Sequence, residues 1–165
     1  MGLEFSAEAL QRFSEVVSRY PKKEAAMIPV LYLAQQEFGY LSPEAIEYVA
    51  KIMEAPTARV YGVVTFYTML NMKPVGRYHI QVCRTLPCAL MGSDRITACL
   101  KRRLGLNVGE TTADGKFTLS EVECLASCGT APMMQINDDY HENLTEEKVN
   151  EILEKLENEA IGNRQ

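Results

Sequence analysis

The chain has 165 residues, of which 47% are hydrophobic and 24% are charged, and its formal net charge is −5. A chain of this length can bury roughly two thirds of its unfolded surface, so a core that needs no metal is expected. The acidic balance argues against a nucleic-acid-binding protein, and no stretch reaches the eighteen or so consecutive apolar residues that a membrane span requires.

The N-terminus shows no basic region followed by an apolar one, so we expect a cytoplasmic protein. From there a period of about 3.6 residues runs through the first seventy residues and predicts a bundle of four helices. Ser6 is placed to cap the first helix, which Pro21 ends. The second extends from Glu24 to Phe38, and Pro29 inside it predicts a kink or a late start. Gly39 is placed as its C-terminal cap.

The third and fourth helices follow at once. Ser42 and Pro43 begin the third, and the fourth is expected from about Thr57 to Leu70. Three aromatic residues of this last segment are expected in the core, with the alternative that some of them face a partner protein: Tyr61, Phe66 and Tyr67.

The pattern changes at residues 71–76, where proline and glycine interrupt the helical period. Beyond this point Tyr78, Ile80 and Val82 alternate with polar residues, which predicts a strand with one buried face. We therefore expect a helical domain at residues 1–75, a second domain at 76–160, and a frayed tail at 161–165. The helical domain carries no candidate ligand and its apolar stripes need a covering surface, so we expect it to serve assembly with a partner. The alternative is that its helices pack only on one another or on residues 76–160.

The second domain is expected to alternate between strands and helices. Ser93 is placed to cap a helix that Gly105 closes. A turn at Asp114 and Gly115 leads into the strand-like segment FTLSEVE. Two more strands are predicted, at residues 133–136 and in the short YHEN segment. Thr145 is placed to cap a final helix. This order predicts a compact α/β or α+β layer, so the fold class is α+β (α/β).

Four of the five cysteines form two pairs: Cys83 and Cys88 in a C-x4-C spacing, and Cys124 and Cys128 in a C-x3-C spacing. A reducing compartment leaves such thiols free for metal binding or catalysis. Each pair follows a predicted strand, so loops from neighbouring strands can bring four thiolates together at one sheet edge. Four sulfur ligands suit zinc or an iron-sulfur cluster. The spacing favours iron-sulfur but leaves zinc open.

Other reactive residues have simpler interpretations. Cys99 lies on the inward face of a predicted helix and is expected in the core. The sequence contains no C-x-x-C pair, which argues against a disulfide oxidoreductase. His79 and His141 are expected at the surface rather than as ligands, and residues 109–116 form a turn rather than a phosphate loop. Arg84 directly follows Cys83, and its positive charge either stabilises the added negative charge of a reduced metal centre or simply faces water.

Three segments together resemble a known family. TFYTML at 65–70, VCRTLPC at 82–88 and ECLASCGTAPMMQIND at 123–138 are similar to the thioredoxin-like 2Fe-2S subunit of respiratory complex I, the E-type subunit of NADH:quinone oxidoreductase. The resemblance covers nearly the whole chain. It implies an N-terminal helical bundle followed by a thioredoxin-like 2Fe-2S ferredoxin domain, with one cluster on Cys83, Cys88, Cys124 and Cys128.

The resemblance also implies a function. Proteins of this kind exchange single electrons with the FMN of a partner, the F-type NADH-binding flavoprotein subunit, and have neither a catalytic residue nor a substrate site of their own. FMN and NADH sit on the partner, and the peripheral arm lies at the inner face of the cell membrane without inserting this chain into it. Related subunits occur in NAD-linked hydrogenases and formate dehydrogenases.

Two further expectations accompany this interpretation. A zinc-stabilised interaction module, in which the same thiolates only hold two loops together, is the alternative from another functional class. By analogy with thioredoxin folds, the Ala131-Pro132 peptide bond is expected to be cis.

Overall fold

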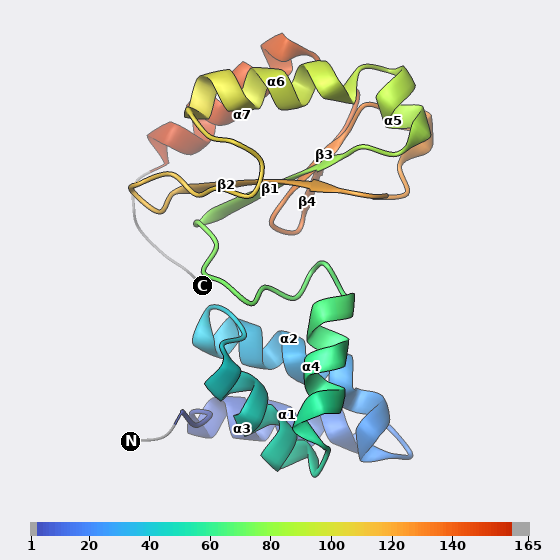
Figure 1. The fold of residues 1–165 in the computed structure, drawn as a ribbon, viewed down its shortest axis with the longest axis vertical. Helices are drawn as coiled ribbons and strands as arrows, with labels where there is room; N and C mark the ends of the chain where they lie inside the picture. The colour runs from blue at the N-terminus through green and yellow to red at the C-terminus, as the bar shows by residue number, and fades with distance from the viewer. Residues whose placement is uncertain (1–2, 160–165) are drawn as a thin grey trace. The chain divides into compact units, whose positions relative to one another are not determined.

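The computed structural model describes residues 3–159 and has two compact units, Met1–Val75 and Gly76–Gln165 (Figure 1). Each unit contains a hydrophobic core of its own. The tail expected at 161–165 lies outside the described residues. Within residues 3–159, no helix is both long enough and apolar enough to cross a membrane.

The N-terminal unit is a helical bundle whose helix ends follow the sequence signals. Its elements are α1 (Ala7–Ser18), the 3-10 helix η1 (Lys23–Ala26), α2 (Met27–Phe38), α3 (Pro43–Met53) and α4 (Thr57–Phe66). The Ser6 hydroxyl accepts a hydrogen bond from the Ala9 N–H at 3.2 Å, and Ser42 caps α3 in the same way. Gly39 ends α2 with a φ of 82°, a conformation that favours glycine.

Two helix boundaries differ from those expected by simple periodicity. The segment from Glu24 first forms the 3-10 helix η1 and becomes α-helical only at Met27, so the late start that Pro29 predicts is observed. Proline lacks an N–H and is tolerated in the first turn of a helix. Helix α4 ends at Phe66 instead of Leu70, after a run of β-branched residues that lowers helix propensity.

The apolar stripes of these helices are buried against one another. Phe5 enters this core from outside the helices, and its ring lies 5.1 Å from the ring of Tyr48 and 5.4 Å from that of Phe38. The largest fully buried side chains of the unit are Val30, Leu31, Leu41, Ile46, Val49 and Met53. The unit therefore has a buried core that is complete within residues 3–75.

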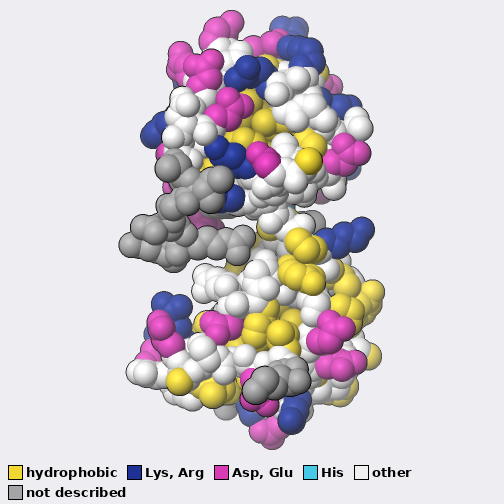
Figure 2. Space-filling model, turned by 90° about the vertical axis from the view of Figure 1, so that its left-hand side faces the viewer, with side chains coloured by type: hydrophobic (Ala, Val, Ile, Leu, Met, Phe, Trp, Pro, Cys, Tyr) yellow, Lys and Arg dark blue, Asp and Glu magenta, His cyan; other side chains and the backbone are white. Residues whose placement is uncertain are grey.

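The prediction that the aromatic residues of α4 lie in the core is wrong for two of the three. Tyr61 is 50% exposed and Phe66 is 77% exposed, whereas Tyr67 is half-buried against the core. Helix α4 buries Val60 and Val64, which are one turn apart, so Tyr61 and Phe66 project from other faces of the helix. Hydrophobic side chains accordingly reach the surface of this unit in several places (Figure 2).

The second unit is a four-stranded mixed sheet with helices. Its strands are β1 (Tyr78–Cys83), β2 (Phe117–Val122), β3 (Met134–Ile136) and β4 (Asp139–His141), in the order β2-β1-β3-β4. Strand β1 runs parallel to β2 and antiparallel to β3, and β4 pairs antiparallel with β3. Its helices are α5 (Leu86–Leu90), α6 (Ser93–Leu104) and α7 (Glu146–Asn158). The predicted α+β class is confirmed.

Helices α6 and α7 lie on the same face of the sheet (Figure 1). The core between them and the sheet includes Ile80, Leu119 and Leu153, and Cys99 is buried there as predicted. The opposite sheet face carries polar side chains, including His79, whose Nε2 lies 2.8 Å from the Ser120 hydroxyl. The alternation along β1 thus separates an apolar face from a polar one.

Gly76 lets the chain enter this sheet. Its N–H donates to the Thr118 hydroxyl at 2.6 Å. A Cβ at this position would lie 2.8 Å from the backbone carbonyl carbon of Phe117, which is closer than real Cβ atoms approach. Glycine is therefore required by the close approach of two backbones.

The N-terminus of α6 corrects one prediction. Gly92, with a φ of 98°, is the cap residue, and Ser93 is already inside the helix. The Ser93 hydroxyl is buried and has no hydrogen-bond partner within residues 3–159. By contrast, Thr145 caps α7 as predicted, because its hydroxyl accepts from the Lys148 N–H at 3.3 Å.

Substituting the two hydroxyl residues should therefore give different results. Thr145→Ala is expected to lower the free energy of unfolding by about 1 kcal/mol because a cap is lost. Ser93→Ala is expected to leave it unchanged or raise it, because an unpaired buried hydroxyl is removed. Urea denaturation followed by circular dichroism measures both. An equal loss in the two variants would contradict the assignment of Gly92 as the cap.

Candidate metal centre

The two cysteine pairs follow two parallel strands that end at the same edge of the sheet. Cys83 is the last residue of β1 and lies in register with Val122, the last residue of β2. The Arg84 N–H donates to the Val122 carbonyl at 3.0 Å, and Cys124 comes two residues later. Since parallel strands end at a common edge, the loops that begin here are neighbours, as predicted.

The first pair is buried. Cys83 is 4% exposed and Cys88 is 2% exposed, and both pack with Met133. Cys88 lies within the short helix α5, which periodicity did not predict. Pro87 in its first turn is the one sequence signal for this helix, since proline is common at that position.

The second pair is exposed. Cys124 and Cys128 both lie in the loop after β2, and Cys128 begins the 3-10 helix η2 (Cys128–Thr130). The Ala126 N–H donates to the Cys124 sulfur at 3.3 Å. Ala126 has a φ of 60°, so the loop turns sharply between the two cysteines.

Burial and hydrogen bonds shift the acidity of the first pair in opposite directions. Burial alone would raise the pKa of the Cys83 thiol, but hydrogen bonds from the N–H groups of Thr85 and Leu125 lower it overall. Burial, together with the hydrogen bond to Cys83, raises the pKa of Cys88 to about 11, and the charge of Cys128 adds to this rise.

The four sulfur atoms are not arranged as a finished metal site. Within residues 3–159, no three His, Cys, Asp or Glu side chains lie close enough together to hold a metal ion as they stand. All five cysteines are free thiols. The Cys83 sulfur lies 3.6 Å from the carbonyl oxygen of Glu123, the neighbour of Cys124. The assignment of all four thiols as ligands remains a prediction.

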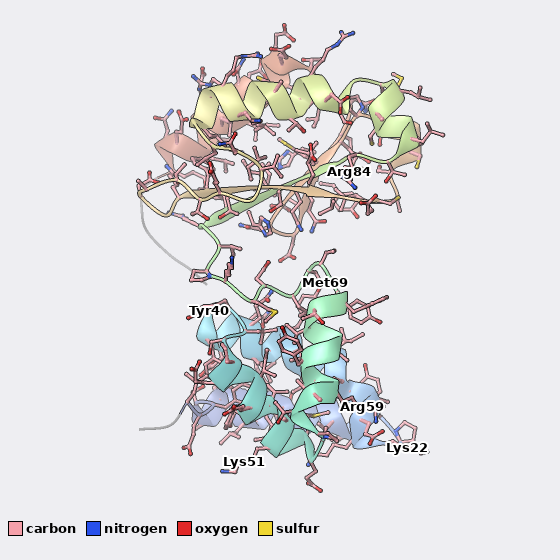
Figure 3. All side chains as sticks on the ribbon, viewed as in Figure 1. Lys22, Tyr40, Lys51, Arg59, Met69 and Arg84 are labelled. Carbon is pink, nitrogen blue, oxygen red and sulfur yellow. The ribbon has the colours of Figure 1, made fainter. Side chains whose placement is uncertain are left out.

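An ion pair connects the residues next to the two cysteine pairs. The Arg84 guanidinium donates to one carboxylate oxygen of Glu123 at 2.7 and 3.0 Å, and it lies at the end of β1 (Figure 3). Both side chains are more than half exposed, so water screens their attraction and the pair adds little to stability. The Arg84 side chain is thus exposed and its charge is balanced by Glu123, while its effect on a reduced metal centre stays a prediction.

The Ala131-Pro132 peptide bond is cis, so this prediction is confirmed. The carbonyl of Met133, the residue that follows, accepts a hydrogen bond from the Cys83 N–H at 3.2 Å. The segment 131–133 thus lies directly against the first cysteine of the site.

A family model described as thioredoxin-like [2Fe-2S] ferredoxin matches residues 13–157. The chain belongs to this family. Among the relatives of this ferredoxin, the E-type subunit of the NADH-quinone oxidoreductase of Rickettsia conorii is 51% identical over 158 residues, which cover 94% of this chain and 95% of the relative. One of the E-type subunits of the same oxidoreductase in Rhizobium meliloti is 42% identical, and the match covers 88% of this chain and 87% of the relative.

A solved structure shares the fold. A chain in the crystal structure of NAD+-reducing [NiFe]-hydrogenase in the air-oxidized state matches this ferredoxin with a TM-score of 0.71 and 19% identity. The match covers 81% of the ferredoxin but only 23% of that chain. Together with the family model, it confirms the predicted helical bundle followed by a thioredoxin-like domain.

The residues of this ferredoxin fit a 2Fe-2S cluster. Four free thiols stand on adjacent loops, and iron-sulfur clusters are commonly held by four cysteine thiolates. Two nearby carboxylates are already engaged, Glu123 by Arg84 and Glu142 by the hydroxyls of Ser127 and Thr130. The four thiols are not tied up in disulfides and so remain able to bind a metal.

The unequal burial of the thiols predicts unequal reactivity in the metal-free protein. Iodoacetamide should label Cys124 and Cys128 at least about tenfold faster than the buried thiols of Cys83, Cys88 and Cys99, because reactivity follows exposure. Peptide mass spectrometry at timed intervals measures each site, and unfolding in urea should equalise the rates. Equal labelling of all five thiols in the folded chain would contradict the described loop positions.

Proposed function

We propose that this chain is the electron-transfer subunit of an NADH:quinone oxidoreductase, complex I, and that it carries one 2Fe-2S cluster on Cys83, Cys88, Cys124 and Cys128. The observation that carries the proposal is the meeting of two cysteine loops at one edge of the sheet. The relatives support the proposal, because proteins that align with most of this chain over most of their own length are named as E-type subunits of that oxidoreductase.

The cluster, when bound, supplies a centre that accepts and returns one electron. The protein holds it between a buried and an exposed pair of thiolates. The Ala126 N–H donates to the Cys124 sulfur at 3.3 Å, and the backbone N–H groups of Thr85 and Leu125 lower the pKa of Cys83. Such hydrogen bonds stabilise negative charge on sulfur and so favour the reduced state.

The electron partner is proposed to be the FMN of the F-type flavoprotein subunit, which also binds NADH. The chain then acts as part of an oxidoreductase and has no substrate site of its own. The exposed position of Cys124 and Cys128 supports this role, since an electron carrier needs its metal near the surface that meets the donor. The complex would place this chain at the cytoplasmic, inner face of the cell membrane.

Two alternatives compete with this proposal. The first is the equivalent subunit of an NAD-linked hydrogenase or formate dehydrogenase. A chain of an NAD+-reducing [NiFe]-hydrogenase shares the fold, but the relatives above favour complex I. A zinc-stabilised interaction module uses the same thiolates, and iron analysis separates it from a ferredoxin.

The helical unit is proposed to serve assembly with the partner subunit. The apolar stripes of its helices are buried within the unit and do not support the proposal. It rests on side chains that remain exposed on α4 and just beyond it: Tyr61, Phe66 and Met69, the last labelled in Figure 3. Exposed aromatic residues are enriched in protein interfaces.

The first prediction concerns the metal. The purified protein should contain iron and acid-labile sulfide in about equal amounts, as a 2Fe-2S cluster requires. Replacing any of the four proposed ligands by alanine should remove or alter the visible spectrum. Cys99→Ala is the matched control, which should keep the spectrum and cost about 1 kcal/mol of stability. One equivalent of zinc in a colourless protein would refute the proposal.

The second prediction concerns assembly. The variant Tyr61→Ser/Phe66→Ser should keep the cluster spectrum but lose most of its binding to the flavoprotein subunit, because interface aromatics commonly carry the largest share of binding energy. Leu10→Ser changes a residue of α1 that is 45% exposed and serves as the control. Co-purification and titration calorimetry measure the binding. Unchanged affinity of the double variant would reject this docking surface.

A further inference from the structure

The loop that carries the second cysteine pair has little hydrophobic packing. None of residues 123–130 is fully buried, and only Leu125 packs partly against the buried first pair. The loop belongs to no strand. By contrast, Cys88 is buried within α5. Without burial to hold it, the second loop depends on hydrogen bonds for its conformation.

Strand β4 and the turn that follows it supply hydrogen bonds to residues 125–130 of this loop. The Tyr140 hydroxyl donates to the carbonyl of Leu125, the residue directly after Cys124, at 2.9 Å. The Asn143 N–H donates to the Thr130 carbonyl at 2.7 Å, just after Cys128. The two contacts hold the loop near both of its cysteines.

Glu142 makes the central contact between these two. One of its carboxylate oxygens accepts hydrogen bonds from the Ser127 hydroxyl and from the Thr130 hydroxyl, the latter at 2.7 Å. Ser127 directly precedes Cys128. The two hydroxyls lower the pKa of Glu142, so the carboxylate stays ionised and the bonds are charge-assisted. A single side chain thus fixes both sides of Cys128.

We propose that Glu142 and Tyr140 are positioning residues that hold the second cysteine loop in its cluster-binding conformation. The proposal rests on the proposed ligand role of Cys124 and Cys128. Neither residue is a ligand, and each acts through the backbone or hydroxyl groups beside a cysteine. The first pair is fixed by burial and the second by this polar brace, defined as Tyr140, Glu142 and Asn143.

The test compares Glu142→Ala with Glu142→Gln in the full chain carrying its cluster. The alanine variant should release iron to a chelator about tenfold faster, because both hydrogen bonds that position the loop are lost. The glutamine amide oxygen can still accept from both hydroxyls, so this variant should stay within about twofold of the parent. The electron paramagnetic resonance spectrum of the reduced protein should broaden or shift in the alanine variant alone.

Two further variants serve as comparisons. Glu147→Ala removes the same charge from the first turn of α7 and should not change iron release. Tyr140→Phe keeps the ring but removes the hydroxyl that reaches Leu125, and should accelerate release several-fold even if Glu142→Ala fails to fold. Parent-like release in both Glu142→Ala and Tyr140→Phe would overturn the proposal. Iron release from Glu142→Gln as fast as from Glu142→Ala would also overturn it, because the charge of Glu142 and not its hydrogen bonds would then control iron release.

A readout on the metal-free chain separates this proposal from the cluster assignment. Hydrogen exchange of the Asn143 amide, which bonds to the loop, should become about tenfold faster in Glu142→Ala and stay slow in Glu142→Gln. If exchange is faster in metal-free Glu142→Ala but the purified parent protein contains only zinc, the brace is supported. The zinc content then refutes the 2Fe-2S cluster. Unchanged exchange in Glu142→Ala would refute the brace whatever the metal.

Discussion

The parallel pairing of β1 with β2 is the constraint on which the site depends. Because Cys83 lies in register with Val122, both strands end together and both cysteine loops begin at one edge. A shift of one residue in this register would turn every side chain of one strand to the other face and move its loop away. The buried faces of both strands, packed under α6 and α7, hold the register in place.

The two halves of the site are stabilised by different forces. Cys83 and Cys88 are held by apolar burial, whereas the loop of Cys124 and Cys128 is held by hydrogen bonds and stays open to solvent. Burial protects one side of a metal from water. Exposure of the other side leaves a short path to a partner. This division suits a protein that must keep its metal and still pass electrons to another protein.

The sequence by itself determined most of the elements, the fold class and the candidate ligands. Helix caps at Ser6, Ser42 and Thr145 are local hydrogen bonds between residues three apart, so they can be read from the sequence directly. The alternation along β1 is equally local. The cysteine spacing and the three family-like segments pointed to the thioredoxin-like 2Fe-2S ferredoxin family, which the family model matches over residues 13–157.

Only the tertiary structure decided which residues act across the fold. No local pattern indicates that Glu142 meets Ser127, because fifteen positions separate them and the contact exists only when β4 lies beside the loop. The same holds for Gly76 against Phe117 and for the exposure of Tyr61 and Phe66. Local patterns record periodicity and caps. Contacts between distant segments depend on how the sheet and helices pack, and single-sequence periodicity carries no information about that packing.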